Sequence, residues 1–208
     1  MKGLLLKDIY GLKKFWKTAV VFVGIFFLIG MMNGSEASFV SGMIVIYAAM
    51  LTITSFAIEE AAMWNQYALS MPLNRFTMVL EKYILSIILS LCGVLLSAVM
   101  VLMMSLVTQQ KVSSEVFLSI GMVFFVGMIL VSFFIPLLYR FGSEKARLML
   151  FLFFAIPFIL IFLIEQFFPS LPDVINFETV IKLTPFLTIV VMSLSFVISN
   201  RIVKKKEF

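Results

Sequence analysis

The chain has 208 residues, of which 62% are hydrophobic and 13% are charged, and its formal net charge is +5. Soluble domains average about half apolar and about a quarter charged residues, so this composition excludes an ordinary soluble domain. The short length and the repeated long apolar runs favour a single all-α membrane domain and exclude a transmembrane β-barrel, whose strands alternate polar and apolar residues.

Residues 1–17 predict an amphipathic helix that lies in the membrane interface, with its lysines toward anionic lipid headgroups. The lysine face carries Lys2, Lys7, Lys13, Lys14 and Lys17. The apolar face consists of Leu4, Leu5, Ile9, Leu12, Phe15 and Trp16. Asp8 interrupts the apolar face, where an unpaired charge is costly. We expect it to be a solvated or salt-bridged carboxylate, or else a contact to a partner or a neighbouring helix.

Six apolar runs follow, because about 20 residues of helix cross the ~30 Å hydrocarbon core of a bilayer. The predicted spans are 18–32, 39–58, 83–107, 116–138, 148–168 and 183–200. The first run is shorter than the usual minimum of about 17 residues. Lys17 can snorkel and Trp16 can lie at the headgroup level, which makes this short span tolerable.

The distribution of lysine and arginine predicts the orientation of the chain. With the N-terminus inside and six alternating spans, 14 of the 16 basic residues lie on the inner side. They number five in 1–17, two in 59–82, three in 139–147 and four in 201–208. Basic residues concentrate in cytoplasmic loops, so we expect a multi-pass protein of the cell membrane with both termini in the cytoplasm.

Motifs of catalysis and metal binding are absent from the sequence. There is no histidine, no H-E-x-x-H motif and no P-loop, so we expect no catalytic residue and no metal site in this chain. We also expect no nucleic-acid partner. The single cysteine, Cys92, stands in an apolar run and is interpreted as a small core residue.

The predicted spans carry small hydroxyl groups and no central charge. Ser86 and Ser90 are candidates for a substrate path, and Pro157 is a candidate hinge because proline kinks a helix. Glu165, near the outer end of its span, is either an interfacial charge or a substrate ligand. Such spans suit an amphipathic or lipid-like substrate better than an inorganic ion or a sugar.

The longest polar interval of the chain is 57–83. Helical spacing places one stripe of side chains on Glu60, Met63, Trp64, Tyr67 and Met71. Pro72 then ends the helix, and Asn74 is placed to cap a new helix that begins at Arg75 and continues into the third span. Aromatic residues with methionine are typical of a surface that docks a partner. Alternatively, Trp64 and Tyr67 belong to the aromatic belt at the headgroups.

Two segments resemble the integral-membrane permease subunits of type-2 ATP-binding-cassette exporters, particularly a compact branch with six spans and no ectodomain. The first segment is 4–8, which reads Leu-Leu-Leu-Lys-Asp. The second is the polar interval, and its matching residues are Glu59–Glu60, Trp64, the Tyr-Ala-Leu-Ser run 67–70, Pro72, Asn74–Arg75 and Lys82–Tyr83.

The resemblance implies that 59–82 is a coupling helix, which seats in a groove of a separate ATPase subunit. Its coupling residues would be Glu59, Glu60, Met63, Trp64, Tyr67, Met71 and Arg75. Two permease chains, identical or different, would pair with two ATPase subunits that bind ATP and Mg²⁺. This chain would then bind no cofactor of its own, and its substrate would be an amphipathic or lipid-like molecule, such as a toxic or antimicrobial peptide.

Three other functions fit parts of the pattern. A substrate-capturing membrane component of an energy-coupled vitamin importer also has about six spans, but it needs no coupling helix of its own. A membrane scaffold or regulatory protein would carry no substrate at all. A membrane enzyme is disfavoured because the histidine and the intramembrane acid pair that such chemistry uses are missing.

Overall fold

The computed structural model describes residues 2–33, 37–69, 74–109, 114–167 and 177–205, without the side chains of 32, 33, 37, 65, 66, 69, 108, 147 and 150–181. Over these residues the chain is helical and contains no strand, which confirms the predicted all-α class. The elements are α1 (Lys2–Leu12), η1 (Lys13–Phe15), α2 (Trp16–Asn33), α3 (Ala37–Ala61), α4 (Trp64–Leu69), α5 (Arg75–Thr108), α6 (Ser114–Phe167) and α7 (Phe177–Lys205).

Five helices in the described part of the chain are long and apolar enough to cross a membrane. Their spanning candidates are Lys2–Met31, Ser38–Ala61, Arg75–Val107, Ser114–Ala146 and Lys182–Lys205. The predicted span 148–168 falls in the second half of α6, whose backbone is helical as far as Phe167. Its side chains lie almost entirely outside the described residues, so the sixth span stays a prediction.

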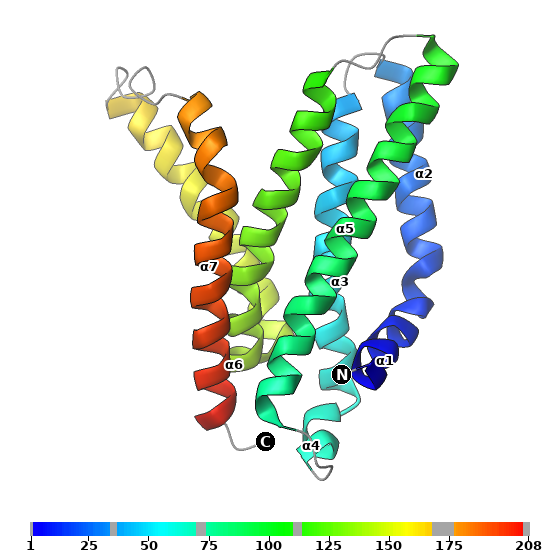
Figure 1. The fold of residues 1–208 in the computed structure, drawn as a ribbon. Helices are drawn as coiled ribbons and strands as arrows, with labels where there is room; N and C mark the ends of the chain where they lie inside the picture. Colours follow the sequence, from blue (N-terminus) through cyan, green and yellow to red (C-terminus); the bar gives the residue numbers. More distant parts are fainter. Residues whose placement is uncertain (1, 34–36, 70–73, 110–113, 168–176, 206–208) are drawn as a thin grey trace.

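Helix α3 is the centre of the bundle, and α2 stands at its edge (Figure 1). The most apolar window of α3 has 61% of its residues buried, against 6% for the first spanning candidate. The main core joins Ile53 and Phe56 of α3 to Val79 of α5, Phe134 of α6 and Val203 of α7. Since α2 contributes nothing to this core, its outer surface is left to lipid.

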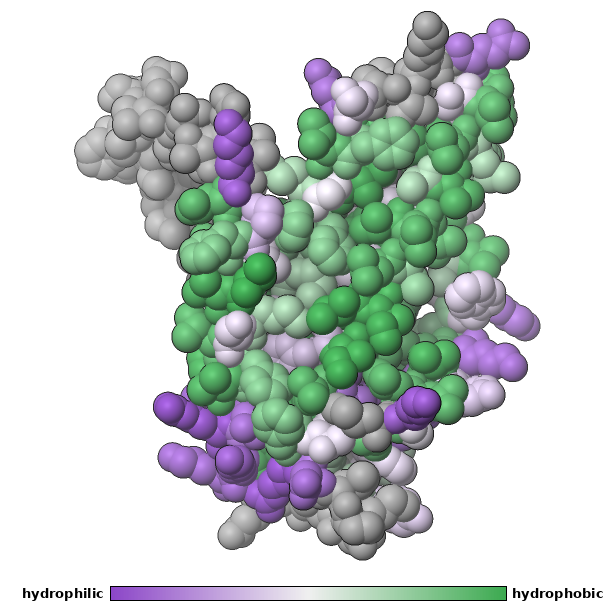
Figure 2. Space-filling view, in the orientation of Figure 1, coloured by the Kyte–Doolittle hydropathy of each residue, from purple (hydrophilic) through white to green (hydrophobic). Residues whose placement is uncertain are grey.

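Helices α1 and α4 and the C-terminal end of α7 lie at the same end of the molecule (Figure 1). Hydrophilic residues gather at this end, and a broad hydrophobic surface covers the body of the bundle (Figure 2). This arrangement agrees with the predicted placement of the polar interval beside both termini. That this end is cytoplasmic still rests on the lysine and arginine distribution.

Two backbone breaks shape the helices near this end. Gly142 interrupts α6 at φ 82° and ψ 172°, a conformation that side chains oppose and glycine tolerates. Met63 adopts a φ of 49° between α3 and α4. Helix α5 is continuous over 34 residues, as the sequence predicts for the segment that begins at Arg75, so it extends about 50 Å.

Candidate functional site

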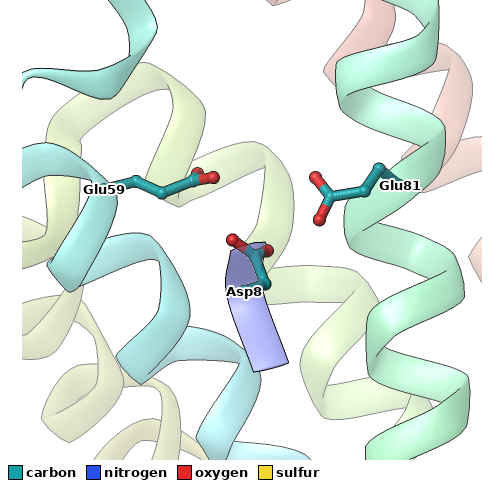
Figure 3. Close-up of side chains that lie close together, drawn as sticks. All are labelled: Asp8, Glu59 and Glu81. Atoms are coloured by element: carbon teal, nitrogen blue, oxygen red, sulfur yellow. The ribbon is translucent and has the colours of Figure 1, made fainter. Parts of the chain in front are cut away.

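Five ionisable side chains from three helices meet near the end of the molecule that carries α4. We call them the ion cluster: Lys7 and Asp8 of α1, Glu59 of α3, and Glu81 and Lys82 of α5. The three carboxyl groups point toward one another from their separate helices (Figure 3). The cluster therefore joins the N-terminal helix to the two helices that flank α4.

Lys82 is the centre of the cluster. Its side-chain nitrogen lies 2.5 Å from Asp8 Oδ2 and 2.8 Å from Glu59 Oε2, and it donates to Ser55 Oγ at 3.0 Å. Lys7 pairs with the same two carboxylates, at 3.0 Å from Asp8 Oδ1 and in a closer contact with Glu59. Lys82 is only 1% exposed, and a buried charge is tolerated only where it has such partners.

Of the three acids in the cluster, Glu81 lies farthest from the Lys82 ammonium. Its carboxylate lies 4.0 Å from Lys82 Nζ, and its Oε1 is buried without a hydrogen-bond partner among the described residues. Three carboxyl groups face two ammonium groups, so the fully ionised cluster carries an excess of negative charge. Asp8 and Glu59 make the close ion pairs with both lysines, so these pairs hold α1, α3 and α5 in position.

The spacing of the acids also raises the question of a metal site. Oxygens of Asp8, Glu59 and Glu81 lie within 4.8 Å of one another, as ligands of one cation can. The ammonium groups of Lys82 and Lys7 already contact Asp8 and Glu59, so they take the place of a cation beside these two acids. We interpret the arrangement as an ion-pair network that connects helices.

Helix α4 reaches the cluster through an aromatic contact. The Lys7 ammonium lies 4.3 Å from the centroid of the Trp64 ring, and the ring of Tyr67 lies 5.6 Å from that of Trp64. Beside these contacts, α1, α3 and α4 line a cavity of about 460 Å³, part of it open solvent, whose walls include Lys7, Asp8, Glu59 and Trp64. A displacement of α4 would thus act directly on the cluster.

The predicted stripe from Glu60 to Met71 is wrong as a single helical face. Helix α3 ends at Ala61, and the left-handed backbone of Met63 redirects the chain before α4 begins at Trp64. Glu60 contacts α6, where its Oε2 accepts a hydrogen bond from the Ser143 backbone amide at 2.5 Å, beside the break in that helix. Met71 lies outside the described residues.

Helix α5 begins at Arg75 as predicted, but the capping bond expected from Asn74, at the N-cap position, is not made. Arg75 instead connects α5 with the C-terminal end of α7, where its Nη1 donates to the carbonyl oxygens of Val203 at 3.1 Å and Lys204 at 2.7 Å. These carbonyls belong to the last turn of a helix, where they lack partners within the helix.

Only part of the predicted apolar face of the N-terminal helix packs against the bundle. The buried residues of α1 are Leu4, Asp8 and Leu12, while Ile9 is exposed, as is Trp16 at the start of α2. Asp8 makes the contact to a neighbouring helix that the sequence left open as an alternative. Its position one turn from both buried leucines was the available signal, because residues four apart share a face. The remaining interfacial lysines, Lys2, Lys13 and Lys14, are exposed.

The candidate path residues lie farther along the bundle. Ser86 is buried and donates to the Tyr83 carbonyl oxygen at 2.7 Å, and Ser90 is buried without a hydrogen-bond partner among the described residues. The side chains of Pro157 and Glu165 lie outside the described part of the chain. The role of these four residues in a path or hinge stays a prediction.

A buried hydroxyl network, which the sequence did not predict, joins α5 to α7. The Tyr83 hydroxyl lies 2.6 Å from Ser195 Oγ and 3.0 Å from Ser199 Oγ. Ser195 in turn donates to the Ser132 carbonyl oxygen of α6. Such bonds between membrane helices favour one packing arrangement over its neighbours, so α5 is held to both α6 and α7 next to the ion cluster.

Comparison with known proteins gives one match, to a protein family. The family model described as "ABC-2 family transporter protein" matches residues 3–204, which include every member of the ion cluster and all of α4. No curated protein and no solved structure matches the chain.

Proposed function

The chain belongs to the ABC-2 family of transporter proteins, and from this premise we propose that it is the permease subunit of an exporter. Two permease chains would form the path, and two copies of a separate ATPase subunit would bind ATP and Mg²⁺ and drive transport. The substrate would be an amphipathic or hydrophobic molecule, for which a toxic or antimicrobial peptide is the leading candidate.

The observation that carries the proposal is the position of α4. This short helix lies between α3 and α5 at the end of the bundle where hydrophilic residues gather (Figures 1 and 2). Met63 and Tyr67 are exposed there, and Trp64 is partly exposed. Exposed aromatic and methionine side chains on a short projecting helix suit a groove on a cytoplasmic partner.

The proposed coupling runs from α4 through the ion cluster. Movement of α4 against the ATPase would shift Trp64 over Lys7, and Lys7 is paired with Asp8 and Glu59. Both acids also hold Lys82 of α5. Because α5 is one uninterrupted helix, a displacement at its lower end would be carried across the membrane.

A second connection would carry motion to α6. Glu60 follows Glu59 at the end of α3, and it accepts a hydrogen bond from the amide of Ser143 just after the break at Gly142. Adjacent residues of one helix thus hold α5 and α6 separately. In this proposal the end of α3 distributes the movement of α4 to both helices.

The proposal for the substrate rests on what the spans contain. The predicted spans carry no charged residue near their centres, and their polar groups are small hydroxyls. A strongly hydrated ion or sugar would need more polar partners along a path than these groups offer. An amphipathic peptide or lipid-like molecule needs fewer.

The coupling assignment can be tested with the double substitution Trp64→Ala, Tyr67→Ala. We expect the variant permease to copurify poorly with its ATPase subunit and to lose stimulated ATP hydrolysis. Phe186→Ala is a matched control, because Phe186 is an exposed aromatic residue on α7, far along the chain from α4. Unimpaired copurification and unchanged stimulated hydrolysis in the double variant would remove α4 from the coupling interface.

A further inference from the structure

A large apolar cavity lies between α2 and the pair formed by α3 and α5, with α1 and η1 at one end. It encloses about 950 Å³, part of which is open to the surroundings, and we call it the apolar groove. Its lining includes Leu12, Trp16, Tyr47, Leu51, Ile88 and Cys92. The part of this space that small molecules can occupy is about 250 Å³, near the lower end of the roughly 300–1,000 Å³ range of small-molecule sites.

The groove exists because α3 and α5 pack closely while α2 does not. A side chain at Gly93 of α5 would place its Cβ 2.5 Å from the Cβ of Ala48, so these two helices are in near-backbone contact and form the floor. Helix α2 reaches α3 through the stacked rings of Phe22 and Tyr47, whose centroids lie 4.2 Å apart. Farther along α2, the buried Gly30 leaves no room for a side chain beside Met104 of α5 and Val40 of α3, so the groove lies between this contact and η1.

The charged residue of the groove lies at the end formed by α1 and η1. This residue is Lys13 of η1, and no acidic residue that the structure describes belongs to the lining. Lys13, Lys14 and Lys17 are exposed, and among the residues that the structure describes none of them forms an ion pair. Trp16, exposed beside them, is a residue type that lies at the headgroup level of membranes.

An apolar slot with a cationic mouth at the headgroup level matches one class of ligand, an anionic amphiphile with a long hydrocarbon chain. From this charge complementarity we propose that the apolar groove binds one acyl chain of an anionic phospholipid of the adjacent leaflet, with its phosphate at Lys13. Water is a poor occupant, since it needs two to four polar partners that this lining lacks. A hydrocarbon chain makes dispersion contacts with every wall of the groove.

The bound lipid would fill the space between α2 and the rest of the bundle. It would therefore fix the position of α2 and of the N-terminal helix that carries Lys7 and Asp8. The proposal needs only the membrane location of the chain. It does not rest on the proposed exporter function, and its test involves neither ATP nor transport.

The single cysteine gives a direct readout, because Cys92 is exposed and lines the groove. The full-length protein is placed in nanodiscs of phosphatidylcholine, with or without phosphatidylglycerol of identical chains, and its labelling by a small apolar maleimide is timed. We expect phosphatidylglycerol to slow labelling about fivefold, the ratio that one lysine–headgroup attraction supplies. Lys13→Gln should abolish this difference, whereas Lys2→Gln, a change at an exposed lysine outside the lining, should preserve it.

A second measurement guards against effects on the reagent or on folding. In the variant Cys92→Ser, Leu102→Cys, the thiol lies at an exposed position of the same helix that does not belong to the lining of the groove. It should therefore label at equal rates in both lipids. Native mass spectrometry should detect a retained phosphatidylglycerol on the unaltered protein and none on Ala19→Phe, which fills the groove. Equal labelling of Cys92 in both lipids would overturn the proposal. Protection by an amphipathic peptide in pure phosphatidylcholine, with none by phosphatidylglycerol, would overturn it too.

Discussion

The ion cluster and the apolar groove are built largely by the same helices, α1, α3 and α5, yet they solve packing in opposite ways. In the cluster, charged groups converge until Lys82 is only 1% exposed. In the groove, apolar side chains face one another across space that the protein does not fill. The difference follows from the chemistry of each place, because buried charges demand specific partners and apolar groups in a bilayer do not.

The two regions also differ in what holds their helices in place. Ion pairs fix the distance and direction between helices, so we expect a displacement of α1 or α4 to reach α5 through the cluster. Along the groove, a lipid tail is as good a neighbour as a leucine side chain, so α2 has little to hold it to α3. We therefore expect α2 to shift more readily than the end of the bundle that carries the cluster.

The largest effect is expected from Lys82→Met, which removes the centre of the cluster. Asp8 and Glu59 would lose their shared partner while still buried, and breaking such a pair costs about 3–5 kcal/mol. We expect a large fall in the thermal stability of the detergent-solubilised protein, with α1 becoming accessible to protease. Lys205→Met, at an exposed lysine of α7, should leave both readouts unchanged.

A second substitution separates a required charge from a required pair. The variant Asp8→Ala, Lys82→Met removes both partners, and it should be more stable than Lys82→Met alone because fewer unpaired charges remain. If Lys82→Met alone melts at the temperature of the unaltered protein, the cluster does not hold the helices together.

A matched pair of substitutions compares the two regions directly. Ser55→Val removes an acceptor of the Lys82 ammonium, and hydrogen bonds to charged groups contribute about 1.5–3 kcal/mol. Cys92→Val makes a change of similar size in the groove and should stay within about 0.5 kcal/mol. Thermal melts of the two variants under identical conditions give the difference. Equal losses would mean that the groove is packed as tightly as the cluster.

Gly142→Ala tests the second connection at the end of α3. The backbone of Gly142 has a φ of +82°, and an added Cβ would lie 2.4 Å from Glu60 Oε1, so strain and displacement of Glu60 act together. Such a backbone conformation costs a non-glycine residue about 1–3 kcal/mol. Gly121→Ala in the same helix meets nothing within 4 Å and should be neutral or slightly stabilising. Hydrogen exchange at the Ser143 amide should rise only in the first variant.

Among the changes to the ion cluster, the smallest effect is expected from Lys7→Gln. It removes the contact with Trp64 and the pairs with Asp8 and Glu59, but Lys7 is partly exposed, so the loss should be about 0.5–1 kcal/mol. We expect a changed Trp64 fluorescence with little change in melting temperature. Because Trp16 also emits, the comparison is made in a Trp16→Phe background. An unchanged spectrum would separate α4 from the cluster.

The sequence predicted the helices of this protein well because their signals are local. Apolar runs and helical periodicity predicted the all-α class and the continuous helix from Arg75. Prediction from the sequence failed where contacts with a distant helix determine the position of a side chain. The predicted stripe from Glu60 to Met71 required a single helix. The residue types of this segment do not predict the left-handed backbone of Met63.

Some members of the ion cluster could be inferred from the sequence, and others could not. Asp8, spaced four residues from both Leu4 and Leu12, signalled a buried acid, and Ser55 and Glu59 share one face of α3 by the same spacing. Their common partner could not be read, since Lys82 follows Glu81 in a segment that looks like an ordinary charged helix start. Cys92 was interpreted as a core residue, but it is exposed in the groove.

Composition and apolar run length by themselves determined that this chain is a bundle of membrane helices with a polar interval between two of them. Those properties follow from the cost of placing backbone and charge in hydrocarbon, which each segment meets alone. Which charges pair, and where the bundle stays open, only the tertiary structure decided. Pairing depends on α1, α3 and α5 meeting at one place. The groove depends on α3 and α5 packing closely together while α2 lies farther away.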